Sequence, residues 1–112
     1  MKRRIFSMLL GAAVSTFFIP GLALAENHLS EAITHTKEAI EHGKAGHADI
    51  LVTHAKEGLK HAEAAEKEKA NPHTAEGITH LKVAIDEGKK KDAKAATGHA
   101  EEALTHLDAA TK

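Results

Sequence analysis

From residue 28 onward, apolar and polar residues follow a repeat of about seven positions. Isoleucine, leucine or alanine falls one, four and five positions after successive histidines. At about 100° per residue these positions share one face of a helix. The pattern therefore predicts amphipathic helices, and the lack of two-residue alternation argues against strands.

Residues that favour helix ends divide this pattern into four segments. Gly43 and Gly46 bracket a first turn, Asn71-Pro72 offer an N-cap and a first-turn proline, and Gly88 is expected to end the third segment. Asp92 is a suitable N-cap for the fourth. We predict helices near residues 28–43, 47–69, 72–88 and 92–111.

The second half of the chain resembles the first. Residues 28–67 align without a gap on residues 73–112, with 19 of 40 positions identical. Two helical hairpins with short turns bury their apolar faces best against each other. We expect an all-α protein, an antiparallel up-down four-helix bundle made of two duplicated helical hairpins.

The N-terminal segment has the features of a secretory signal peptide. Lys2-Arg3-Arg4 precede an apolar stretch at residues 5–19, then Pro20 and the small-residue site Ala23-Leu24-Ala25. We expect a signal peptide at residues 1–25, a mature domain at residues 26–112, export to the periplasm, and no membrane insertion after cleavage.

Composition limits the function of the expected mature chain. It keeps 12 basic and 16 acidic residues, a net charge of about −4, which disfavours a nucleic-acid-binding surface. It has no cysteine and no methionine, which excludes disulfides, thiolate metal sites and c-type haem attachment. Any bound metal must be held by nitrogen and oxygen. We expect a monomer with metal ions as its partners.

Ten histidines recur in this heptad register at the flank of the apolar face, where solvent can reach them. A glutamate follows three positions after several of them. Residues three or four apart are neighbours on a helix surface, so the pattern predicts ladders of nitrogen and oxygen donors. The candidate ligands are His28, His35, His42, His47, His54, His61, His73, His80, His99, His106, Glu31, Glu38, Glu57, Glu76 and Glu102.

Antiparallel pairing would also place histidines opposite one another as rungs. Two residues lie opposite each other in a hairpin when they are equally far from its turn, so their residue numbers add up to a constant, here 89 in the first hairpin and 179 in the second. The resulting pairs are His42/His47, His35/His54, His28/His61, His80/His99 and His73/His106. A further rung would hold Glu87 and Asp92, a weaker site of carboxylates alone. Any two segments with a seven-residue repeat, joined by a turn of fixed length, would give such constant sums. Spacing alone therefore leaves open whether these flanks face each other.

Imidazole and carboxylate together suit copper(II), nickel(II) and zinc(II), and copper(II) binds such ligands most tightly. Many similar, partly exposed sites are typical of a metal buffer or scavenger and not of an enzyme. Binding requires neutral imidazole, so affinity should fall as pH drops through about 6.5.

Three blocks of sequence carry a family resemblance: HTKEAIEHGK at residues 35–44, HAKEGLKHA at 54–62 and HAEEALTHL at 99–107. Together with the signal peptide, they resemble the small metal-binding protein family of nitrifying bacteria. The resemblance implies periplasmic binding of several copper(II) ions, acceptance of other divalent metals, and a role in copper homeostasis and tolerance. The family is richer in histidine, and Glu87 and Asp92 leave full occupancy of the second hairpin open.

Three other interpretations remain. A di-metal enzyme on the same bundle is disfavoured because the chain has no Glu-x-x-His motif. A haem protein is disfavoured because the expected mature chain has no cysteine and no methionine, which leaves open only a haem held by two histidines. A pH-responsive stress protein is the second, since protonating ten histidines would move the net charge from about −4 to about +6. The third is a structural helical module with only incidental metal binding.

Overall fold

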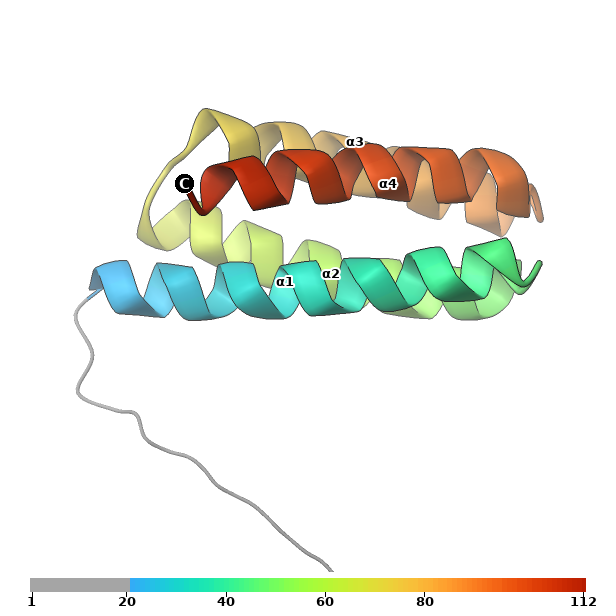
Figure 1. Cartoon of the computed structure of the whole chain (residues 1–112), viewed down its shortest axis with the longest axis horizontal. Helices are drawn as coiled ribbons and strands as arrows, with labels where there is room; N and C mark the ends of the chain where they lie inside the picture. Colours follow the sequence, from blue (N-terminus) through green and yellow to red (C-terminus); the bar gives the residue numbers. More distant parts are fainter. Residues whose placement is uncertain (1–20) are drawn as a thin grey trace, which may run out of the picture.

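The computed structural model describes residues 21–112, with side chains from Leu24 onward. Four helices follow one another: α1 (Gly21–Lys44), α2 (Ala48–Glu68), α3 (Pro72–Lys89) and α4 (Ala93–Ala110). The hairpins α1/α2 and α3/α4 form two layers, and each helix packs against the one before and after it, with α4 returning to α1 (Figure 1). The predicted all-α, up-down four-helix bundle is confirmed.

Helix α1 is longer than predicted. It begins at Gly21, seven residues before His28, so the expected cleavage site after Ala25 lies inside it. The apolar stretch at residues 5–19 lies outside the described residues. A chain that starts at Glu26 would still contain every histidine of the sequence.

The predicted helix caps of the second hairpin are confirmed. The Asn71 side chain accepts a hydrogen bond from the His73 backbone N–H at 2.8 Å, directly before Pro72. The Asp92 carboxylate accepts one from Ala95 N–H at 3.0 Å. Each satisfies one of the free N–H groups at a helix start. The α2/α3 and α3/α4 connections are thus fixed locally by their own sequence.

Gly88 does not end α3, contrary to the prediction. The helix continues through Lys89, and Gly88 is buried at a close approach to α2: a Cβ there would lie 2.5 Å from Val52 Cγ2. Gly43 is likewise inside α1, where a Cβ would overlap Thr97 and Leu51. Both glycines allow close contact between the two layers, and the sequence alone does not distinguish such a glycine from one that ends a helix.

Alanine dominates the interior. Leu51, Leu81 and Leu107 are the largest fully buried side chains. Around them lie completely buried alanines, among them Ala32, Ala39, Ala55, Ala62, Ala84, Ala96, Ala100 and Ala103. Because alanine is small, the helix backbones can approach closely, and short side chains on the flanks of the core can meet across each hairpin.

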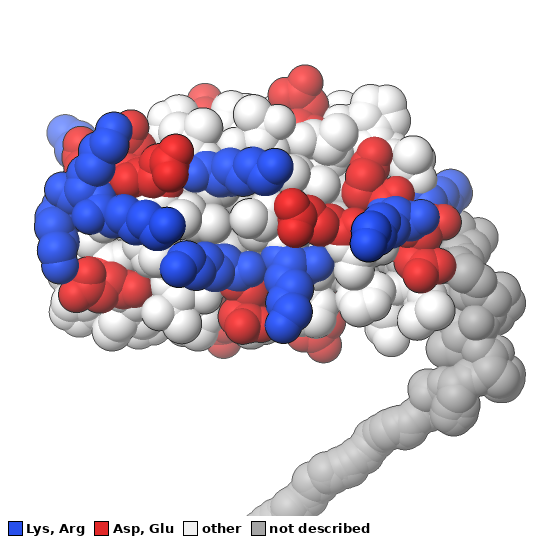
Figure 2. Space-filling model, turned by 180° about the vertical axis from the view of Figure 1, so that it is seen from behind, with Lys and Arg blue, Asp and Glu red and all other residues white. Residues whose placement is uncertain are grey.

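Charged side chains cover the outside of the bundle. Figure 2 shows lysines and acidic residues interspersed over one face, with basic side chains gathered at one end. The sequence places Lys89, Lys90 and Lys91 at the α3/α4 turn. None of the four helices is long and apolar enough to cross a membrane.

Candidate metal centre

Six histidines of the first hairpin form one continuous row in the groove between α1 and α2. They alternate between the helices, and each ring lies next to the following one; we call this the first ladder. The ring centroids are separated by 5.3 Å (His28–His61), 5.7 Å (His61–His35), 5.9 Å (His35–His54), 5.3 Å (His54–His42) and 6.1 Å (His42–His47).

The four histidines of the second hairpin repeat this arrangement between α3 and α4. The centroid separations in this second ladder are 5.8 Å (His73–His106), 5.4 Å (His106–His80) and 6.0 Å (His80–His99). All five histidine rungs predicted from the sequence are therefore present. The flanks that carry the histidines do face each other.

The structure adds diagonal neighbours that the rung scheme lacks: His35/His61, His42/His54 and His80/His106. Histidines seven residues apart lie about 10.5 Å apart along a helix. Two such rows from facing helices interdigitate, which halves the spacing in the groove. The predicted isolated rungs are thus a connected series.

The best-defined donor group of the first ladder joins both helices. Nδ1 of His35 and Nδ1 of His54 lie 3.3 Å and 3.2 Å from the same carboxylate oxygen, Oε1 of Glu38. We call His35, Glu38 and His54 the first rung group. Metal–nitrogen and metal–oxygen bonds of about 2.0–2.2 Å at tetrahedral angles place neighbouring donors about 3.4 Å apart. The observed separations match that spacing.

The second ladder has an equivalent group, His80, His99 and Glu102, the second rung group. Here the two Nδ1 atoms lie 3.2 Å and 3.4 Å from Oε1 of Glu102. The carboxylate now comes from α4, the second helix of its hairpin, whereas Glu38 comes from the first. The sequence explains this change, because Val83 stands 45 residues after Glu38 and carries no donor.

The histidine donors of both rung groups are buried and lack hydrogen bonds. Nδ1 of His35, His54, His80 and His99 is inaccessible to solvent and makes no hydrogen bond of acceptable geometry with any described residue. Buried polar atoms without a partner are unfavourable in folded proteins. A cation bound between the two nitrogens and the carboxylate would satisfy them. The four histidine side chains as a whole remain 24–36% exposed.

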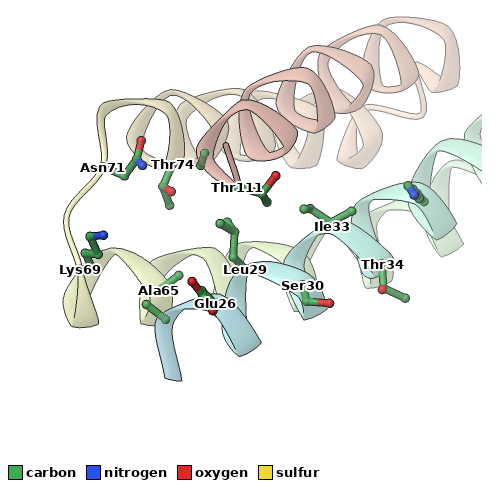
Figure 3. Close-up of a pocket in the computed structure, with 13 residues that line it drawn as sticks. Glu26, Leu29, Ser30, Ile33, Thr34, Ala65, Lys69, Asn71, Thr74 and Thr111 are labelled. Carbon is green, nitrogen blue, oxygen red and sulfur yellow. The ribbon is translucent and has the colours of Figure 1, made fainter. Parts of the chain in front are cut away.

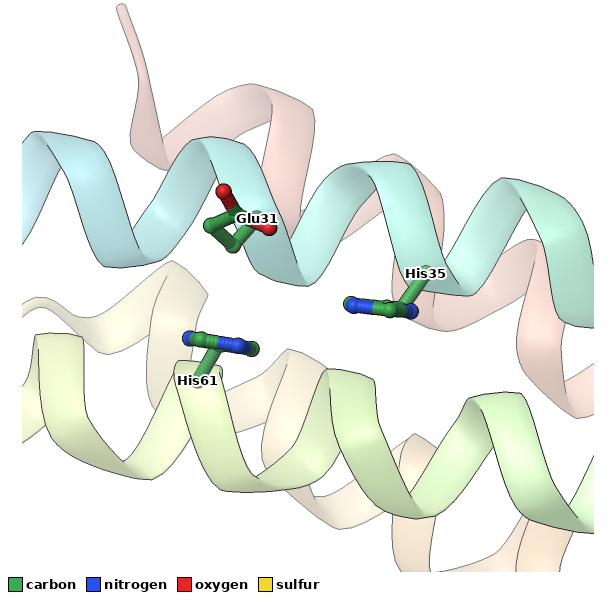
Figure 4. Close-up of side chains that lie close together, drawn as sticks. All are labelled: Glu31, His35 and His61. Carbon is green, nitrogen blue, oxygen red and sulfur yellow. The ribbon is translucent and has the colours of Figure 1, made fainter. Parts of the chain in front are cut away.

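A second type of group lies along each diagonal. In the first diagonal group, Glu31, His35 and His61 offer donor atoms within 4.8 Å of one another, and Figure 4 shows the two rings between α1 and α2 with Glu31 beside them on α1. Glu76, His80 and His106 form the second diagonal group in the other hairpin. Glu31 and Glu76 each act with the histidine four positions later on their own helix, together with one from the facing helix.

The remaining predicted ligands lie outside these three-residue groups. His28 is one of them, and its Nδ1 lies 3.1 Å from Nδ1 of His61, a member of the first diagonal group. His42, His47 and His73 contact neighbouring rings of the ladders. Glu57 joins none of the groups found among the described residues. The two residues of the expected carboxylate rung, Glu87 and Asp92, join none of the three-donor groups found among the described residues, and the Asp92 side chain caps α4.

A cavity of about 570 Å³ lies at the end of the bundle where α1 begins and α4 ends (Figure 3). Leu29 and Ile33 form part of its apolar wall, with Glu26 and Lys69 among its polar residues. No histidine lines it, so this cavity is separate from the ladders.

Comparison with known proteins agrees with this geometry. A family model described as small metal-binding protein matches residues 2–110, nearly the whole chain. No curated protein matches significantly.

Proposed function

Because the chain belongs to the small metal-binding protein family, we propose that it buffers or scavenges divalent metal ions, with copper(II) preferred. Nickel(II) and zinc(II) would also be accepted. The ions would be held by the histidine ladders together with Glu31, Glu38, Glu76 and Glu102. The physiological role would be metal homeostasis and tolerance.

One observation carries this proposal most strongly. Four buried imidazole nitrogens lie in pairs, each pair within 3.2–3.4 Å of one carboxylate oxygen, and none of the four makes a hydrogen bond of acceptable geometry with a described residue. A bound cation explains both the convergence and the missing partners.

The choice of copper(II) rests on ligand chemistry. Nitrogen and oxygen donors favour copper(II) over nickel(II) and zinc(II) in the order of intrinsic affinities. Thiolate and thioether ligands would instead favour copper(I), and the chain has no cysteine and has methionine only at positions 1 and 8.

A buffer explains the number and openness of the groups better than an enzyme does. Each group offers three donors, which leaves coordination positions for water, and the ladders run along partly exposed grooves. Neither ladder encloses a substrate-sized space with one catalytic constellation. We therefore propose a non-enzymatic binding protein.

We also propose that the protein works in the periplasm. The basic start, the apolar stretch at residues 5–19 and the Ala23-Leu24-Ala25 site support this location. Fractionation of expressing bacteria, followed by mass spectrometry, should recover a periplasmic chain that begins at Glu26. Recovery of the intact chain from the cytoplasm would contradict this location.

The direct test is copper(II) binding to tag-free protein at pH 7.5 in competition with a weak chelator, followed by circular dichroism and thermal unfolding. We expect more than one ion to bind more tightly than free imidazole binds copper, and the unfolding temperature to rise, since a ligand that binds only the folded state stabilises it. Binding no tighter than imidazole, with no change in stability, would favour the pH-responsive or structural interpretation.

A further inference from the structure

His35 belongs to two donor groups at once. It is part of the first rung group with Glu38 and His54, and of the first diagonal group with Glu31 and His61. His80 has the same double membership in the second ladder, with His99 and Glu102 on one side and Glu76 and His106 on the other. The other histidines of these groups belong to only one each.

The two groups on a hairpin approach the shared ring from different sides. Nδ1 of His35 lies 3.3 Å from Oε1 of Glu38, on the side of the rung group. In Figure 4 the ring edge of His35 farthest from its Cβ points toward Glu31 and His61. A neutral imidazole has one nitrogen with a free lone pair and one that carries a proton. It can therefore bind one ion unless it also loses the second proton.

Electrostatics also opposes simultaneous occupancy. Two divalent ions on the two nitrogens of one ring would repel each other at short range, and three donors per group include only one carboxylate to offset that charge. A single ion can choose either group. Moving between them requires the shared ring to exchange its proton and its lone pair between the two nitrogens.

From this overlap, and resting on the proposed metal-binding function, we propose that His35 and His80 are shared ligands and that each hairpin tightly holds one ion, which exchanges between its rung group and its diagonal group. His54 and His61 are then alternatives to each other, as are His99 and His106. Removing His54 or His61 destroys one group of the first ladder and leaves the other complete. Removing the shared His35 destroys both the rung group and the diagonal group.

The test uses full-length, tag-free protein carrying His80→Ala, which removes both groups of the second ladder and leaves the first ladder intact. Copper(II) is titrated against a competing chelator, and the number of tightly bound ions and their association constant are measured. His35→Ala, His54→Ala and His61→Ala are compared in this background. Thr53→Ala, an exposed residue of α2 outside both ladders and all donor groups, is the matched control.

We expect one tight ion in the parent, in Thr53→Ala, in His54→Ala and in His61→Ala, and none in His35→Ala. Because two mutually exclusive groups contribute additively to the apparent association constant, the constants of His54→Ala and His61→Ala should sum to that of the parent. His35→Gln provides a second loss variant that keeps a polar side chain, and circular dichroism verifies that each variant is folded.

Two results would overturn the sharing. Two tight ions in the parent, with magnetic coupling between coppers in electron paramagnetic resonance, would show that the His35 ring bridges two ions. Loss of tight binding in His54→Ala as complete as in His35→Ala would show that the diagonal group holds no ion by itself. A parent and wild-type protein that bind no copper tightly would instead contradict the proposed function.

Discussion

Gly46 and Lys91 occupy matching places in the two hairpin turns, 45 residues apart, and both have a positive φ, 84° and 69° respectively. This left-handed conformation is free of steric cost for glycine and unfavourable for a residue with a Cβ. Lys91 also forms an exposed ion pair with Asp49, at 3.0 Å. Exposed pairs of this kind contribute little.

We therefore expect Lys91→Gly to stabilise the protein by about 1 kcal/mol, because it removes the strain and sacrifices only a weak ion pair. Urea unfolding followed by circular dichroism measures the change. Gly46→Ala is the converse variant and should destabilise. Equal stability of Lys91→Gly and the wild type would mean that the second turn bears no significant strain.

The alanine-rich core should be sensitive to loss of its few leucines. Leu51 is fully buried, whereas the adjacent Ile50 is 41% exposed. Leu51→Ala should lower the free energy of unfolding by about 2–5 kcal/mol, because it leaves a cavity. Ile50→Ala, the matched control, should change it by less than about 0.5 kcal/mol. Similar losses in both variants would contradict the observed burial.

Exchanging the carboxylate between ladders tests the rung groups. In a chain that also carries His61→Ala, so that the first diagonal group is absent, Glu38→Gln should weaken copper(II) binding to the first ladder by at least about tenfold, since even residues that only support a metal ligand contribute about 10–100-fold. Val83 occupies the position of the second hairpin that corresponds to Glu38. Val83→Glu would place a carboxylate there and should strengthen binding to the second ladder. Val83→Gln controls for polarity. Unchanged affinities in Glu38→Gln and Val83→Glu would exclude these carboxylates as ligands.

Metal affinity should depend on pH through the histidines. Protons compete with the ion for the same nitrogens, so binding should weaken as the pH falls. With two histidines per rung group, the affinity should fall by up to about a hundredfold per pH unit where both imidazoles of the free protein carry a proton. Chelator competition from pH 7.5 to pH 5 measures the slope. Affinity that stays constant down to pH 5 would indicate carboxylate binding alone.

The bundle and its rungs could be predicted because they depend on local signals. Heptad spacing places the histidines, and Asn71 and Asp92 cap helices through bonds within a few residues. The diagonal neighbours depend on the axial offset between facing helices, which no residue type encodes. The helix end predicted at Gly88 is wrong because a glycine that ends a helix and a glycine that leaves room for Val52 look alike in sequence.

The donor sets within each ladder were also only partly predictable. Glu38 and Glu57 follow their histidines at the same spacing, yet only Glu38 joins a group. The choice depends on which glutamate reaches across the groove, and this is a property of side-chain direction in the folded hairpin.

The alanines of the core also determine how far apart the paired helices stand. Imidazole and carboxylate side chains are short, and the donors of a rung group come together only if the two backbones are near. An interior of leucines at Ala32, Ala39, Ala55 and Ala62 would add stability but widen the groove. The small alanine side chains of the interior therefore set a short distance between the paired helices. The protein gives up intrinsic stability so that the histidine and glutamate donors of facing helices can contact the same ion.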